Sequence, residues 1–153
     1  MKKTIAAGCL ALCTLGATSA LAADEPANVI KYRQNVMKAI GGNISAIAGV
    51  VKGEVSYTEN VAAHARGIHD MSKLVAGLFP KGTDNKMVSD TRALPAIWDD
   101  WPKFEAAAKA LETASANMIT VAEAGDPSAF GGALQEVGKA CGGCHKPFRA
   151  EKK

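Results

Sequence analysis

The sequence predicts an all-α fold, an antiparallel four-helix bundle. Three observations support this prediction. Four segments carry apolar residues at every third or fourth position, glycine or proline stands at their ends, and a C-x-x-C-H motif lies on the apolar side of the last segment. Aromatic residues make up only 5% of the 153 residues. A core with so few large side chains is small, and a large apolar cofactor would help to fill it.

The first predicted helix covers residues 28–52 and ends at Gly53. Its apolar side consists of Ile30, Met37, Ile40, Ile44, Ile47 and Val51. Gly41 and Gly42 interrupt this helix, and each costs about 1 kcal/mol relative to alanine. Close approach of another helix or subunit would explain the two glycines, and so would a tolerated local weakness.

The second predicted helix begins at Ser56, where Ser56-x-x-Glu59 matches a capping box, and ends before Pro80. A polar connection, residues 81–100, separates it from the third helix. A connection of this length in a compact domain is usually functional or crosses between distant parts of the fold.

The third and fourth predicted helices have clear start signals. Asp99 or Asp100 caps the third, which ends at Gly125. Asp126-Pro127 opens the fourth as an N-cap followed by a first-turn proline. The apolar side of the fourth helix holds Phe130, Leu134, Val137, Cys141, Cys144, His145 and Phe148.

The motif Cys141-Gly142-Gly143-Cys144-His145 is the attachment signature of c-type haem. Its two thiols can add to the haem vinyl groups, and the adjacent imidazole can bind the iron. Spacings of three and four residues place Cys141, Cys144 and His145 on one side of a helix, toward the bundle interior. We therefore expect one covalently bound haem c per chain, with His145 beneath its iron.

Other uses of a C-x-x-C pair fit this chain less well. A redox disulfide of the thioredoxin type needs a strand–helix context, and a zinc site would need further ligands. His64 and His69 lie five residues apart without a carboxylate-rich zinc signature. Histidines in such positions are more often surface or packing residues than ligands.

Residues 1–22 match a secretory signal peptide. Lys2 and Lys3 precede an apolar run over residues 5–15, which is too short to span a membrane, and Ala20-Leu21-Ala22 fits a cleavage site. We expect cleavage after Ala22 or one residue later, a single mature domain over residues 23–153, a periplasmic location and no membrane association after cleavage. Loss of both lysines lowers the formal net charge from +3 to +1, which gives no reason to expect a nucleic-acid partner.

Four pieces of sequence, in order, resemble the cytochrome c′ family, whose members are four-helix bundles. They are Ile30-Lys31-Tyr32-Arg33-Gln34, Leu78-Phe79-Pro80-Lys81-Gly82-Thr83, Ala93-Leu94-Pro95-Ala96-Ile97-Trp98, and Val137-Gly138 leading through the C-x-x-C-H motif to Phe148-Arg149.

The resemblance implies roles for individual residues. Cys141 and Cys144 carry the haem thioethers, and His145 is the proximal axial ligand. Arg33 and Gln34 contact the haem and its propionates. Thr91 and Arg92 make further contacts on the propionate side. Arg149 lies beside the proximal imidazole.

Met37 lies one helical turn after Arg33 and, by the same resemblance, lines the distal side of the haem. In the first reading it does not bind iron, and NO or CO enters by displacing it from a five-coordinate haem. In the alternative, Met37 is the sixth ligand of a low-spin electron carrier, as in relatives that use a methionine of the first helix.

The resemblance also implies electron transfer with an unidentified redox partner and a homodimer formed through the first two helices. No histidine is expected near Met37, so the acid–base groups of a haem enzyme such as a peroxidase are missing. We therefore expect that the protein is not an enzyme.

Overall fold

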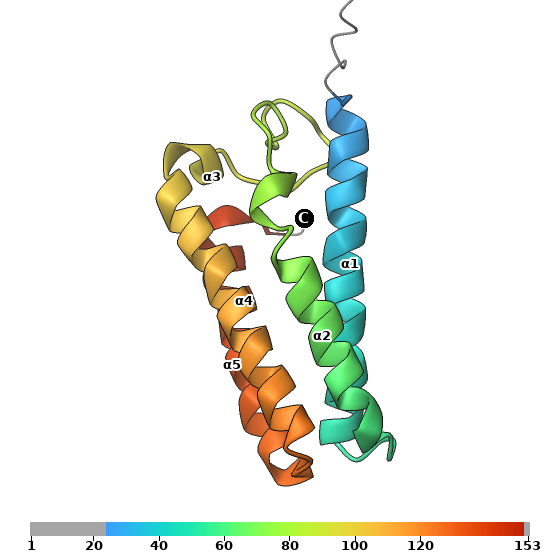
Figure 1. Ribbon diagram of the computed structural model, residues 1–153. Coiled ribbons are helices and arrows are strands. Elements are labelled where there is room, and N and C mark those ends of the chain that lie inside the picture. The colour runs from blue at the N-terminus through green and yellow to red at the C-terminus, as the bar shows by residue number, and fades with distance from the viewer. Residues whose placement is uncertain (1–23, 152–153) are drawn as a thin grey trace, which may run out of the picture.

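The computed structural model describes residues 24–151, so the expected signal peptide lies outside the described residues. Four long helices form an antiparallel bundle (Figure 1), which confirms the predicted fold class. They are α1 (Pro26–Val51), α2 (Val61–Ser72), α4 (Trp101–Glu123) and α5 (Pro127–Phe148). A short helix, α3 (Ala96–Asp99), lies in the connection before α4.

The helices pack as two hairpins, α1 with α2 and α4 with α5. The hairpins meet chiefly where α2 packs on α4, and α1 contacts α5 less extensively. Some of the most deeply buried side chains of the core are Ile47, Val61, Ile68, Met118 and Val137. No helix in the described part of the chain combines the length and apolar character needed to cross a membrane.

The predicted second helix is too long at both ends. A 3₁₀ turn (Thr58–Asn60) precedes α2, the N-cap position makes no side-chain hydrogen bond, and the capping box predicted at Ser56 is wrong. After Ser72 the chain continues through turns and a second 3₁₀ turn (Ala76–Leu78). Val75 and Leu78 are nevertheless buried, because 3₁₀ geometry brings every third residue to the same side.

The predicted starts of the last two long helices are confirmed. The Asp100 side chain accepts a hydrogen bond from the backbone N–H of Lys103 at 3.2 Å. The Asp126 side chain accepts one from the backbone N–H of Ser128 at 2.9 Å. Gly125, which lies between α4 and α5, has φ 75°. This is a left-handed conformation that suits glycine at the end of a helix.

The connection before α4 is anchored to the end of α5. The backbone N–H of Leu94 donates to the carbonyl of Phe148 at 3.0 Å, and that of Ala150 donates to the carbonyl of Arg92 at 2.8 Å. These bonds flank an antiparallel bridge between Ala93 and Arg149. The sequence did not predict this pairing, which fixes the connection beside the C-x-x-C-H motif.

Candidate cofactor site

A cavity of about 790 Å³ lies between α1, the connection, α4 and α5. Its volume is in the range of sites that bind organic cofactors. The structure brings every residue that the sequence proposed for a site to the lining of this cavity. These residues are Arg33, Gln34, Met37, Thr91, Arg92, Cys141, Cys144, His145 and Arg149.

The last two turns of α5 present the C-x-x-C-H side chains to the cavity. Cys141, Cys144 and His145 are each partly buried. Burial raises the pKa of Cys141, and it raises the pKa of Cys144 to about 11. Burial, and then the positive charges of Arg149 and Arg92, lower the pKa of His145. The imidazole is therefore neutral at pH 7 and has a nitrogen lone pair to offer a metal.

The side of α1 that faces the cavity is mostly apolar. Met37, Ile40 and Ile44 line it, and Gly41 lies among them. Met37 is partly buried and packs against the core. Helix α4 adds further apolar walls through Phe104, Ala107, Ala108 and Leu111.

Arg33 joins α1 by hydrogen bonds to the chain segment that leads to α4. Its guanidinium is buried, with 4% of the residue exposed, and donates four hydrogen bonds to oxygens between residues 78 and 91. The acceptors are the carbonyl of Leu78 (3.3 Å), the hydroxyl and carbonyl of Thr83 (both 3.0 Å) and the hydroxyl of Thr91 (2.8 Å). The guanidinium carbon also lies 4.3 Å from the ring centre of Phe79.

The charge of Arg33 has no carboxylate partner among the described residues. Burial lowers its pKa to about 10, so the group is still a cation at neutral pH. Thr83, which is 1% exposed, is a partner that sequence reasoning missed. Thr83 belongs to the Leu78–Thr83 piece that resembles the family, and this was the one sign in the sequence that it matters. The residues around it do not indicate that its side chain contacts α1.

Gln34, Thr91, Arg92 and Arg149 complete the polar edge of the cavity. The Gln34 side-chain amide donates to the carbonyl of Asp90 at 2.6 Å. The buried Thr91 hydroxyl accepts from the backbone N–H of Ala93 at 3.1 Å. Arg92 and Arg149 are exposed. Arg149 pairs with Ala93, the residue after Arg92, in the bridge between the connection and the end of α5.

The residues around the cavity fit haem c. Apolar side chains from α1, α4 and α5 would enclose a flat apolar ring, and two thiols and an imidazole lie on one wall. Among the charged residues that line the cavity, the cations Arg33, Lys38, Arg92 and Arg149 outnumber the single anion, Asp90. Guanidinium groups bind carboxylates through paired hydrogen bonds, so the exposed Arg92 and Arg149 suit a ring that carries two carboxylates.

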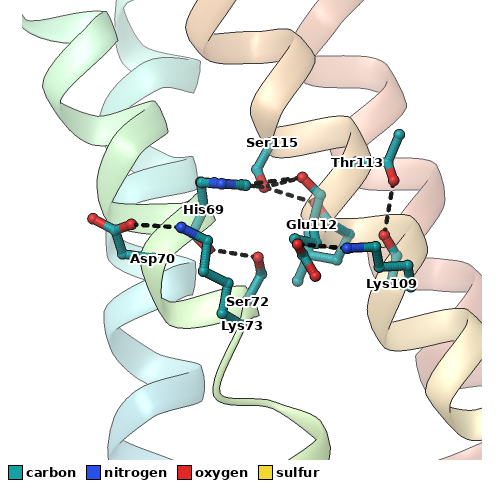
Figure 2. Close-up of polar contacts among 9 residues, drawn as sticks. His69, Asp70, Ser72, Lys73, Lys109, Glu112, Thr113 and Ser115 are labelled. Atoms are coloured by element: carbon teal, nitrogen blue, oxygen red, sulfur yellow. Dashed lines mark hydrogen bonds and ion pairs between the residues drawn. The ribbon is translucent and has the colours of Figure 1, made fainter.

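The other histidines do not line the cavity. Figure 2 shows His69 reaching from α2 toward α4, where its Nδ1 lies 3.1 Å from the carbonyl of Glu112 and 3.3 Å from the Ser115 hydroxyl. Because a carbonyl only accepts, Nδ1–H is the donor. His64 donates to the Asn43 side-chain oxygen at 2.9 Å by the same reasoning. Both histidines join helices, as packing residues do.

Comparisons with known proteins agree with this geometry. The family model described as Cytochrome C′ matches residues 28–149. Cytochrome c′ of Rhodospirillum rubrum is 33% identical over 141 residues, which cover 92% of this chain and 95% of the relative. Cytochrome c-556 of Agrobacterium tumefaciens is 32% identical over 127 residues, 82% of this chain and 100% of the relative.

A solved structure extends the similarity to the fold. A ferrous variant of cytochrome c prime from Alcaligenes xylosoxidans, with bound NO, superposes with a TM-score of 0.75 at 26% identity. The alignment covers 84% of this chain and 98% of that structure. The chain belongs to the cytochrome c′ family, whose members carry covalently bound haem c.

Proposed function

We propose that the mature chain, residues 23–153, is a periplasmic haem protein that binds NO and CO and exchanges electrons with a redox partner. In this proposal Cys141 and Cys144 hold the haem and His145 is its proximal ligand. Met37 covers the distal side of a five-coordinate iron without binding to it. We further propose a homodimer formed through α1 and α2.

One observation carries the proposal: a single cavity is lined by the C-x-x-C-H side chains from α5 and by the apolar face of α1 around Met37. When bound there, haem supplies an iron that can take a diatomic ligand and carry one electron. The residues of α1 that line the cavity after Met37 include Ile40, Gly41 and Ile44, whose side chains carry no acid or base, and this favours neutral diatomics over reactions that need proton transfer.

Individual residues have distinct tasks in this proposal. The neutral His145 side chain keeps a nitrogen free for iron, and the positive charge of the neighbouring Arg149 helps to keep the imidazole unprotonated. Arg33, Gln34 and Thr91 hold the connection against α1, which closes one edge of the cavity. Arg92 and Arg149 add positive charge at the same edge for the carboxylates of the ring.

The visible absorption spectrum of the purified holoprotein tests the proposal. Oxidised and reduced samples are compared before and after addition of CO. We expect a broad high-spin band in the reduced protein that shifts sharply with CO. Sharp low-spin bands that do not respond to CO would contradict gas binding at an open iron.

A second candidate function is electron transfer at a saturated iron, with Met37 as the sixth ligand. Met37 supports it because a thioether lines the same cavity as His145, and Met/His ligation raises the reduction potential. The similarity to a protein named cytochrome c-556 is compatible with either candidate.

Met37→Ala separates the two candidates. The substitution removes the side chain that covers the distal side, so we expect faster CO binding by the reduced protein. If Met37 binds iron, the variant also loses a low-spin spectrum that the native protein has. A low-spin spectrum that survives the substitution would exclude Met37 as the ligand.

A further inference from the structure

Four residues of α1 lie three or four positions before or after Met37, on the same side of the helix. The side chains of three of them are held in place. Arg33 is held by its four hydrogen bonds, Gln34 by its bond to the connection, and Ile40 is buried with 4% exposed. The fourth, Gly41, has no side chain. Gly41 is exposed and lines the cavity together with Met37.

Packing within the protomer does not require glycine at position 41. A Cβ placed there would meet no atom within 4 Å, apart from the helix's own backbone and its chain neighbours. Gly67 on α2 is different, because its Cβ would lie 3.0 Å from the Asn43 side chain, so close helix approach explains that glycine. The close approach considered for Gly41 and Gly42 is therefore absent from the bundle itself.

The direction of helical side chains gives position 41 its importance. Each Cα–Cβ bond tilts toward the N-terminus of the helix, so a side chain at residue 41 would lean over residue 37. With glycine there, Met37 borders open space on its C-terminal side. Methionine has three rotatable bonds, and a side chain at position 41 would take up part of the open space beside it.

We propose that Gly41 is a specificity-determining residue of the distal side. By leaving space next to Met37, it sets how readily Met37 leaves the cavity and thus how fast a neutral diatomic ligand reaches the haem. The part that concerns ligand entry rests on the proposed gas-binding function. The part that concerns Met37 motion does not.

The chain offers a matched control in Gly42. It is exposed, a Cβ there would also meet no atom within 4 Å, and it does not line the cavity. Replacing either glycine by alanine removes the same helix-weakening residue. Gly41→Ala and Gly42→Ala should therefore gain similar thermal stability, and only the former should affect Met37.

The first measurement is the association rate of CO with the reduced holoproteins after flash photolysis. We expect Gly41→Ala to lower the rate by roughly tenfold, the scale set by the rotamer freedom that methionine would lose. Gly41→Leu should lower it further, and Gly42→Ala should match the native protein. Light scattering on each variant shows whether the oligomeric state has changed.

The second measurement does not depend on gas binding. The oxidised holoproteins are treated briefly with chloramine-T, and sulfoxide formation at each methionine is followed by peptide mass spectrometry. Met87, 71% exposed, is the accessible reference, and Met118, 0% exposed, the protected one. We expect Met37 to oxidise measurably in the native protein and in Gly42→Ala, and several times more slowly in Gly41→Ala.

The two measurements separate the two proposals. A native protein that binds no CO contradicts gas binding, and the oxidation of Met37 then decides the role of Gly41. Equal effects of the two alanine substitutions on Met37 oxidation, or native Met37 as protected as Met118, would overturn the inference. So would an unchanged CO rate in Gly41→Ala if the native protein binds CO.

Discussion

Arg33 illustrates how one side chain can serve both the fold and the site. A buried cation without an ion-pair partner is costly, yet four hydrogen bonds and the Phe79 ring surround this one. Four of its five N–H groups already have protein acceptors. The resemblance implied a contact with the haem propionates, whereas the structure adds a role as the link between α1 and the connection.

Replacement of Arg33 by glutamine should release this link. The buried oxygens of Thr83 and Thr91 lose their donor, so we expect the free energy of unfolding of the holoprotein to fall by about 2–4 kcal/mol in urea titrations. Amide hydrogens of residues 83–93 should exchange faster in the same variant. Gln34→Ala, which removes one exposed hydrogen bond, is the control. Equal effects of the two substitutions would contradict the special role of Arg33.

The starts of α4 and α5 were predictable because their signals are local, although the equally local capping-box signal at Ser56 was wrong. Asp100 and Asp126 act as predicted, since an N-cap needs only an acceptor beside the next two or three N–H groups. The end of α2 was not predictable in the same way. Apolar residues continue at three-residue spacing through the turns after Ser72, so the pattern is the same whether the chain is α-helical or not.

The Asp126 cap leads to a prediction about pH. Hydrogen bonds from the side chain and then the backbone of Ser128 lower the pKa of Asp126 below its ordinary 3.8. A carboxyl group whose pKa is lowered on folding stabilises the fold above its ordinary pKa, and this contribution is lost as the pH falls through the lowered value. We expect Asp126→Ala to lower the thermal midpoint at pH 7 by roughly 4 °C and by less at pH 2.5.

Asp126→Asn is the matched control for this cap. Asparagine keeps an acceptor oxygen for Ser128 but does not titrate, so this variant should retain most of the thermal stability at pH 7. Its difference from Asp126→Ala should not depend on pH. A deficit of Asp126→Ala that is the same at both pH values would contradict the contribution of the charge.

The cofactor motif was predictable from sequence because Cys141, Cys144 and His145 lie within five residues of one helix. The other parts of the site come together only in the folded chain. The pairing of Ala93 with Arg149 is a backbone contact across 56 positions, and it leaves no pattern in the side chains. The partners of Arg33 depend on the path of an irregular connection, which periodicity does not describe.

At the scale of the whole molecule, the cavity interrupts the core. Its volume of about 790 Å³ lies between side chains that are mostly apolar, among them Ile40, Phe104 and Leu111. Water in this space leaves those side chains solvated, and apolar burial is the main favourable term behind the roughly 5–15 kcal/mol by which a typical domain is stable. A large apolar ring in the same place would bury them, so haem would act as part of the core.

A chain without haem should therefore keep its helices and lose its tertiary packing. Cys141→Ser combined with Cys144→Ser removes the attachment points, and the haem can then be extracted. We expect a helical far-UV circular dichroism spectrum, but weak near-UV bands and a non-cooperative thermal transition. Trp98 and Trp101 report on the packing, because their rings contact Phe79 and Phe104 at the cavity. Adding haem back should restore the near-UV bands and the sharp transition. A haem-free variant that unfolds cooperatively with native near-UV bands would show that the four helices specify the packing without haem.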